Sequence, residues 1–366
     1  MKVKLGDLTK IKTGKLDANA SSEDGQYPFF TCSREPLKIS NYSYDCECVL
    51  VAGNGDLNVK YYNGKFDAYQ RTYIIEDNSG GQLYMPYLYY FMEGYIKELR
   101  RQAIGGVIKY IKLGNLTDAL IELPSVDAQK KIVNILKKAK QLLSLSNNEI
   151  LKLDELVNAR FVEMFGNPVA NDRGWNTLPL ENACKSIVDC PHSTPSYTNE
   201  DTGFMCIRTS IVKKNKILWD DIEYIPEDEF VKRIQRKKPE VGDIVYTREG
   251  AILGIAAIID RDCNVALGQR SMLLSPDIDK CTSEFVCVAM NSDSFLDNVL
   301  KGVSGSASPH INVGDIKAFR MIMPPVELQK QFSDFVKQVD KSKVAIQKAL
   351  DKTQMLFDSL MQEYFG

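Results

Sequence analysis

The chain repeats itself at a spacing of 200 residues, and this repeat limits its possible folds more than any other feature. The segment LPSVDAQK, residues 123 to 130, matches MPPVELQK, residues 323 to 330. The same spacing carries Phe165-Gly166 onto Phe365-Gly366. An internal repeat of this size indicates that one structural plan is used twice. Because 366 residues give room for two ordinary domains and their connectors, we expect two copies of one domain.

Each copy of the repeat carries the pattern of a long coiled-coil helix, with apolar residues at alternating steps of four and three. In the first copy these residues are Ile132, Leu136, Ala139, Leu143, Ile150, Leu153, Val157 and Met164. In the second they are Phe332, Val336, Val339, Ile346, Leu350, Phe357, Leu360 and Tyr364. Ser146 and Arg160 fill gaps in the first stripe, and Lys343 and Thr353 in the second.

The signals at the helix ends predict two helices of about 40 residues, or roughly 60 Å each. Pro124-Ser125 and Pro324-Pro325 are start signals, and Gly166-Asn167-Pro168 is a stop signal. A small domain cannot wrap around a helix of that length, so we expect the two helices to pack on each other. The alternative is that each stripe packs only on its own domain.

Strand-like runs and turn signals precede each helix, and they also match between the copies. The matched pairs are CVLVAGNG (48 to 55) with DIVYTREG (243 to 250), AYQRTYII (68 to 75) with LGQRSMLL (267 to 274), and YIKLGN (110 to 115) with HINVGD (310 to 315). The first pair reads as a strand followed by a glycine turn, and the second as a turn leading into a strand. The predicted order is therefore domain, helix, domain, helix.

The composition argues against catalysis, a metal site or a membrane location. The chain has only two histidines, and its nine cysteines lack zinc-knuckle spacing, so we expect reduced, mostly buried thiols and no cofactor. Its N-terminus lacks a secretory signal and no segment is apolar enough to span a membrane, which predicts a cytoplasmic protein.

The motifs resemble the repeated regions of the specificity (S) subunits of Type I restriction-modification enzymes. The resemblance rests on the proline-x-valine-acid-x-Gln-Lys helix starts, on RFVEMFGNP (160 to 168), and on VDCPHSTPSY (188 to 197) and GDIVYTREGAILG (242 to 254). It implies an α+β fold with two target recognition domains, residues 1 to 122 and 167 to 322. Spacer helices, residues 123 to 166 and 323 to 366, would pair as an antiparallel coiled coil with pseudo-twofold symmetry.

The resemblance also implies a function and partners. Each target recognition domain would read one half of a bipartite double-stranded DNA site, and the helices would dock two methyltransferase subunits. Restriction motor subunits are a further partner class that the sequence leaves open, as it does the target sequence. The chain itself would be non-catalytic, in keeping with the lack of an adenine-methylation motif. Two alternatives stay open, a coiled-coil scaffold without a DNA role and an autonomous DNA-modifying enzyme.

Base reading needs planar donors and acceptors on loops, chiefly Arg, Asn and Gln. In the first domain the candidates are Arg34, Asn54, Gln70, Arg71 and Lys109. In the second they are His192, Arg208, Thr247, Arg248, Gln269, Arg270 and His310. Structural roles are the alternative for the Gln-Arg pairs and the histidines. The basic cluster at residues 232 to 238 is either a phosphate grip or a solvated face.

The overall charge is unusual for a DNA-binding protein. The formal net charge is −2, and residues 1 to 122 carry 15 basic and 15 acidic side chains. Because phosphate contacts need concentrated Lys and Arg, tight binding is predicted to require the partner subunits.

Overall fold

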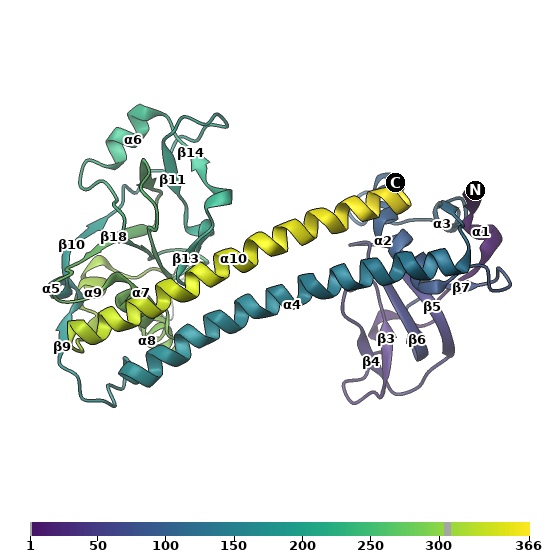
Figure 1. Cartoon of the computed structure of the whole chain (residues 1–366), viewed down its shortest axis with the longest axis horizontal. Coiled ribbons are helices and arrows are strands. Elements are labelled where there is room, and N and C mark those ends of the chain that lie inside the picture. The colour runs from purple at the N-terminus through teal and green to yellow at the C-terminus, as the bar shows by residue number, and fades with distance from the viewer. Residues whose placement is uncertain (1, 304–308) are drawn as a thin grey trace. The chain divides into compact units, whose positions relative to one another are not determined.

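The computed structural model describes residues 2 to 303 and 309 to 366, and it contains two compact units (Figure 1). Unit 1 comprises Met1–Asn147 and Gln347–Gly366, and unit 2 comprises Asn148–Ile346. The structure has two 40-residue helices, α4 (Val126–Phe165) and α10 (Val326–Phe365). Each helix is divided between the two units. Unit 1 therefore holds the start of α4 and the end of α10, and unit 2 holds the reverse.

Unit 1 is built on a six-stranded sheet in the order β2-β7-β5-β6-β3-β4. Its strands are β2 (Thr9–Thr13), β3 (Tyr27–Phe30), β4 (Leu37–Ile39), β5 (Tyr44–Ala52), β6 (Val59–Ala68) and β7 (Thr72–Asp77). Side chains of β5 alternate between the two faces, as in any strand. Val49 and Val51 belong to the core shared with helix α2 (Met85–Gln102). Cys48 and Leu50 belong to a second core with Phe66.

Unit 2 contains a four-stranded sheet in the equivalent order, β10-β18-β15-β16. Its strands are β10 (Cys184–Asp189), β15 (Ile244–Thr247), β16 (Ala256–Ile258) and β18 (Ser271–Pro276). Tyr246 and Met272 share a core with Phe285 of α7 (Ser283–Asn291), and Val245 and Leu273 pack on the opposite face.

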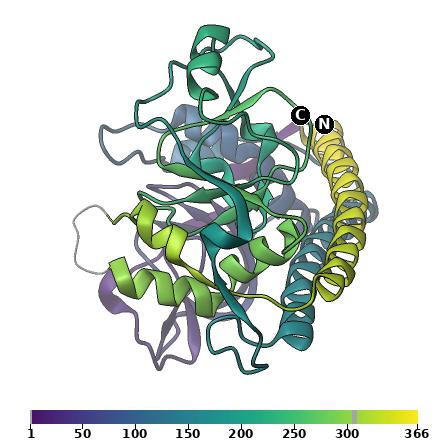
Figure 2. The same ribbon diagram turned by 90° about the vertical axis from the view of Figure 1, so that its left-hand side faces the viewer.

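Unit 2 also carries elements outside the four-stranded sheet. A second sheet has the order β14-β11-β17, formed by β11 (Met205–Ile207), β14 (Glu223–Tyr224) and β17 (Val265–Leu267). The other elements are the ribbon β12 (Val212–Lys213) and β13 (Lys216–Ile217), 3₁₀ turns at Thr209–Ile211 and Trp219–Asp221, and helices α6 (Glu227–Arg233) and α8 (Asp293–Val303). Figure 2 shows α6 at the end of the unit away from α7 and α8.

Each unit has its own copy of a short strand pair and two short helices outside its main sheet. In unit 1, β1 (Lys2–Lys4) pairs with β8 (Leu120–Glu122), and α1 (Leu5–Leu8) and α3 (Leu113–Thr117) lie beside this pair. In unit 2, β9 (Thr177–Pro179) pairs with β19 (Arg320–Ile322), accompanied by α5 (Leu180–Ala183) and α9 (Val313–Ala318). The sequence repeat is thus a structural repeat, as predicted.

The predicted helical seam is present in both long helices. Every position of the two stripes is buried or half-buried, including the polar gap residues Ser146, Arg160, Lys343 and Thr353. In unit 2, Phe161 and Phe165 pack against Phe332 with ring centroids 5.5 Å apart, and Lys343 forms an ion pair with Asp154 at 2.6 Å. Since residue numbers rise on α4 as they fall on α10, the helices run antiparallel within this unit.

A buried glutamine fixes the start of each long helix, that of α4 to unit 1 and that of α10 to unit 2. Gln129 Oε1 accepts a hydrogen bond from the Tyr84 amide at 2.8 Å, and its Nε2 donates to Gln82 O at 2.8 Å and to Pro124 O at 2.9 Å. Gln329 makes the same contacts with the Thr282 amide and with Lys280 O and Pro324 O. Both glutamines are fully buried. This explains the glutamine in the repeated helix-start motif.

Candidate nucleic-acid interface

Three loops of unit 2 meet at one end of its four-stranded sheet. They follow β10, follow β15 and precede β18, and backbone hydrogen bonds join them to one another and to the segment before α9. The Arg248 amide donates to Arg270 O at 3.0 Å, the Ile311 amide to Arg248 O at 2.8 Å, and the Cys190 amide to Ser271 O at 3.3 Å. Loops at strand ends are where side chains can leave the core and meet a partner.

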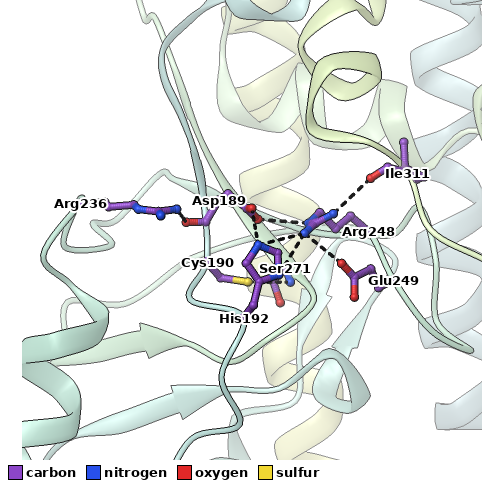
Figure 3. Close-up of polar contacts among 8 residues, drawn as sticks. All are labelled: Asp189, Cys190, His192, Arg236, Arg248, Glu249, Ser271 and Ile311. Atoms are coloured by element: carbon purple, nitrogen blue, oxygen red, sulfur yellow. Dashed lines mark hydrogen bonds and ion pairs between the residues drawn. The ribbon is translucent and has the colours of Figure 1, made fainter.

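Arg248 is the centre of a polar cluster in these loops (Figure 3). Its Nε donates to Asp189 Oδ1 at 3.1 Å, its Nη2 pairs with Glu249 Oε1 at 2.9 Å, and its Nη1 donates to Ile311 O at 3.4 Å. The Arg248 side chain is 6% exposed, against 63% for His192. His192 Nε2 lies 2.9 Å from the other Asp189 oxygen. The buried Arg248 guanidinium therefore holds the carboxylates of Asp189 and Glu249. Asp189 in turn holds the exposed His192 imidazole.

A second buried arginine fixes the loop that follows β10. Arg233 Nη2 donates to Ser193 O at 2.7 Å, Nη1 donates to Leu267 O at 3.2 Å, and Nε pairs with Glu229 at 2.7 Å. The rest of the basic cluster at residues 232 to 238 is also engaged within unit 2: Lys232 with Asp228, Arg236 with Asp189 O, Lys237 with Glu240 and Asp243, and Lys238 with Asn264. These contacts favour a structural role for the cluster over a phosphate grip.

Other predicted residues of unit 2 lie on its surface. Thr194 donates to Gln269 Oε1 at 3.2 Å, which places the half-buried Gln269 beside the His192 loop. Arg270 is exposed and has the left-handed φ of 71°, which is rare outside glycine and asparagine. His310 is exposed and forms a β-bridge with Glu249. These residues thus belong to the same loop region.

Arg208 lies near this region and is held by its neighbours. It pairs with Glu223, and its guanidinium lies 5.5 Å from the centroid of the Tyr197 ring. Its side chain is about half exposed. Arg208 and Tyr197 together offer a cation and an aromatic face.

Unit 1 uses the same backbone frame with different side chains. The Gly53 amide donates to Arg71 O at 2.8 Å, and the Ile111 amide donates to Gly53 O at 2.9 Å, so Gly53 occupies the place of Arg248. Gln70, Arg71 and Lys109 are exposed. Asn54 is half-buried and bridges to Tyr110 as Glu249 does to His310.

Arg34 lies on a separate loop of unit 1 and joins an exposed ion network. Arg34 and Arg100 both pair with Asp56, at 3.2 and 2.8 Å. The hydrogen bond from Arg34 is the main cause that holds the pKa of the Asp56 carboxyl below its usual value, and the charge of Arg34 and the hydrogen bond and charge of Arg100 act in the same direction. Asp56 thereby keeps the Arg34 side chain near the Asn54 turn.

Two predicted DNA contacts need correction, because their side chains lie inside unit 2. Thr247 is fully buried, and its hydroxyl accepts from the Ile255 amide at 2.9 Å. Arg248 is buried by the cluster described above. A buried side chain cannot touch a base edge, so neither belongs to the contact set.

Asp189 is absent from the predicted site residues, and Arg233 enters the prediction only as part of the basic cluster at residues 232 to 238, not as an anchor of the loop after β10. Asp189 stands inside the quoted motif VDCPHSTPSY, three residues before His192, and Arg233 stands in a charged run. Neither residue's partners can be read from local spacing.

The nine cysteines form no disulfide and six of them are buried, which confirms that the thiols are mostly buried. Burial raises the pKa of Cys184, Cys206 and Cys281 to about 12, which disfavours the reactive thiolate. Across residues 2 to 303 and 309 to 366, no group of three or more His, Cys, Asp or Glu is placed to hold a metal ion. No helix in the described part of the chain is long and apolar enough to cross a membrane.

Similar proteins and structures match over most of the chain. It is 28% identical to the Type I restriction enzyme EcoDI specificity subunit of Escherichia coli, over 99% of this chain and 87% of that protein. It is 23% identical to the MjaVIII specificity subunit of Methanocaldococcus jannaschii, over 97% of this chain and 91% of the relative.

The fold is similar to that of a crystal structure of the S subunit of a Type I restriction-modification system from M. genitalium. The TM-score is 0.62 at 16% identity, covering all of this chain and 96% of the other. A chain from a structure on complex assembly of a type I R-M system gives a TM-score of 0.56 at 16% identity, covering 100% and 97%. The model of the Type I restriction modification DNA specificity domain matches residues 1–155 and 174–353. The chain therefore belongs to the family of Type I restriction modification DNA specificity domains.

Proposed function

We propose that this chain is the non-catalytic specificity subunit of a Type I restriction-modification system and that its two units read the two halves of a bipartite DNA site. The observation that carries the proposal is a repeated turn frame with different side chains. Gly53, Arg71 and Ile111 in unit 1 make the backbone contacts that Arg248, Arg270 and Ile311 make in unit 2. Family membership over both copies supports DNA reading over the scaffold alternative.

The residues proposed to contact DNA are the exposed or half-exposed ones around these frames. They are Arg34, Asn54, Gln70, Arg71 and Lys109 in unit 1, and His192, Arg208, Gln269, Arg270 and His310 in unit 2. Arg, Asn and Gln can read base edges in the major groove, and the same cations can instead contact phosphates. Because the two sets differ in chemistry, the half-sites are expected to differ in sequence.

The long helices are proposed to set the distance between the half-sites. In this proposal residues 1 to 122 and 167 to 322 are the recognition domains, and residues 123 to 166 and 323 to 366 are spacer helices in one antiparallel coiled coil. A 40-residue helix is about 60 Å long. Such a spacer would leave a stretch of unread base pairs between the two half-sites.

Two matched apolar patches on the helices are proposed to dock two methyltransferase subunits. In unit 2, Leu156 is 47% exposed and lines a shallow groove with Arg160 and Phe335. The repeat places Leu356 and Ile135, which are also exposed, at the equivalent positions in unit 1. Exposed apolar residues in a repeated arrangement fit a partner that binds once per unit. Restriction subunits are the further partners of the family's complexes.

The near-neutral charge supports DNA binding by the whole complex. Residues 166 to 325 carry 18 basic and 22 acidic side chains, which is a weak attraction for phosphates. Many of the basic residues are also paired within unit 2, as described for residues 232 to 238. The methyltransferase subunits are thus expected to complete the DNA-binding surface.

Mapping of methylated adenines tests the proposal directly. The chain is expressed with its methyltransferase subunit in a host that lacks other adenine methylation, and modified sites are sequenced genome-wide. We expect one bipartite motif with two different half-sites and an unspecified gap. As a matched test, Asn54→Ala should relax only the unit 1 half-site and Gln269→Ala only the other. Methylation that needs the chain but follows no bipartite motif would contradict the proposal.

A further inference from the structure

The loop that carries His192 is unusually well fixed for an exposed segment. The Arg233 side chain, which is 1% exposed, donates to Ser193 O at 2.7 Å. On the other side, Cys190 is buried and its amide donates to Ser271 O. The backbone on both sides of His192 is therefore held by the unit 2 core, although the imidazole itself is mostly exposed.

Asp189 fixes the orientation and the tautomer of the His192 ring. Asp189 Oδ2 lies 2.9 Å from His192 Nε2, while Oδ1 accepts from Arg248 Nε at 3.1 Å. A carboxylate paired with an arginine only accepts hydrogen bonds, so the Nε2 atom carries the proton. In the neutral ring, Nδ1 is then the acceptor.

The Arg248 guanidinium does not use up this acceptor. Arg248 Nη2 lies 3.4 Å from His192 Nδ1 and 3.5 Å from Nε2. Because Nη2 is almost equally far from both ring nitrogens, it does not lie on the in-plane axis of the Nδ1 lone pair, and these are weak contacts. Arg248 also offsets one of the two negative charges of Asp189 and Glu249, which weakens their repulsion of DNA phosphates near the ring.

We infer that His192 is a specificity-determining residue that accepts a hydrogen bond from the exocyclic amino group of one base, with Asp189 and Arg248 as its positioning residues. The inference rests on the proposed DNA-reading function and deepens it. In the major groove the amino groups belong to adenine N6 and cytosine N4, whereas guanine and thymine present carbonyl oxygens. His192 therefore selects an amino base at one position of the unit 2 half-site.

Unit 1 lacks this arrangement, which provides an internal control. Gly53 stands at the place of Arg248, and the strand that precedes the equivalent loop ends in Thr13 where unit 2 has Asp189. Changes at His192 or Asp189 should consequently leave reading of the unit 1 half-site unchanged.

The test removes single amino groups from the DNA. Binding of the complex of this chain with its methyltransferase subunits is measured on duplexes in which purine replaces adenine, or 2-pyrimidinone replaces cytosine, at each half-site position in turn. At one position of the unit 2 half-site, wild type should bind roughly tenfold more weakly to the substituted DNA. The His192→Ala complex should lose less than twofold there, since the contact is already absent. Equal losses in both proteins at every position would overturn the inference.

Two Asp189 variants separate positioning from general stability. Asp189→Asn keeps an oxygen acceptor for His192 Nε2 and should retain most of the discrimination at that position. Asp189→Ala removes the acceptor and should behave like His192→Ala while unit 1 positions stay unchanged. Loss at all positions in both variants, or no change in Asp189→Ala, would contradict the role of Asp189. A wild-type complex that selects no bipartite site would instead overturn the proposed function itself.

Discussion

The sheets of the two units have the same order over four strands, and the units differ most in the strands that lie beyond those four. In unit 1, β6 is one strand of ten residues that pairs antiparallel with β5 and then parallel with β3. Unit 2 divides these two roles between β16, which pairs with β15, and β17, which pairs with β11. The longer connections of unit 2 also form α6, β14 and the ribbon of β12 and β13. The repeat therefore preserves the sheet order and varies the connections.

The same contrast holds within the proposed DNA-reading loops. The backbone hydrogen bonds at Gly53 and Arg248 are equivalent, but the side chains at the two positions have nothing in common. Unit 2 places a buried cation there and uses it to orient its neighbours, whereas unit 1 places a glycine. If these loops read DNA as proposed, a duplicated frame would allow one chain to read two different half-sites, because the frame depends on main-chain atoms and the reading would depend on side chains.

The two apolar helix patches are expected to be equal, and breaking them should give the largest effects. Leu156→Glu or Leu356→Glu would place a carboxylate in an apolar interface, costing about 3 kcal/mol, or more than a hundredfold in affinity. Each single variant should bind one methyltransferase subunit and the double variant none, as measured by native mass spectrometry.

Leu151→Glu is the matched control, because Leu151 on α4 is 60% exposed, no less than Leu156 and Leu356, but lies outside the groove. It should bind two subunits. If both groove variants also kept two subunits, the docking sites would lie elsewhere. If only one of them had an effect, the two patches would not be equivalent.

Replacing either buried glutamine, Gln129 or Gln329, should lower the stability of its unit by the same amount. Gln129→Ala leaves the Tyr84 amide and two carbonyls without partners, and Gln329→Ala does the same for Thr282. Unpaired buried groups of this kind should lower the stability of the affected unit by about 3 kcal/mol. Hydrogen exchange should speed up at Tyr84 or Thr282 respectively, with each change confined to its own unit.

Exposed Gln347 on α10 provides the control for these substitutions, and Gln347→Ala should leave both amides protected. A large effect of Gln129→Ala beside a negligible one of Gln329→Ala would show that the second helix start is anchored differently.

The sequence predicts the parts of the fold that depend on short-range periodicity. The seam of each long helix, with Ser146 and Lys343 in its gaps, follows from steps of four and three, and the paired turns follow from the glycines at 55 and 250. Those signals lie within a few residues of the structure that they specify, so one sequence suffices to predict them.

The roles of the arginines could not be predicted in the same way. Arg248 is buried because Asp189, 59 residues earlier in the chain, accepts its Nε hydrogen bond. Arg233 is buried because it reaches the carbonyls of Ser193 and Leu267, 40 and 34 residues away. An arginine on a turn and an arginine inside a core look alike in sequence, since only tertiary contacts decide which one meets solvent.

The smallest expected effect is on stability, and it depends on the backbone of Arg71 and Arg270, which occupy equivalent positions in the two units. A Cβ at Gly53 would lie 2.4 Å from Arg71 O, so unit 1 needs glycine at that place. Unit 2 has a Cβ there, on Arg248, and the facing Arg270 adopts a φ of 71°, whereas Arg71 keeps a negative φ. The left-handed backbone costs a non-glycine residue about 1 kcal/mol.

Arg270→Gly and Arg71→Gly should therefore differ in stability by about 1 kcal/mol. Glycine at 270 removes the backbone strain and offsets its own entropic cost in the unfolded chain, so stability should stay within about 0.5 kcal/mol of wild type. Glycine at 71 relieves no strain and should lower stability by about 1 kcal/mol, measured by urea unfolding of the full chain. Both variants lose a cation and should reduce the salt dependence of DNA binding equally. Equal destabilisation would mean that the Arg270 backbone is unstrained, and that the two reading loops differ in side chains alone.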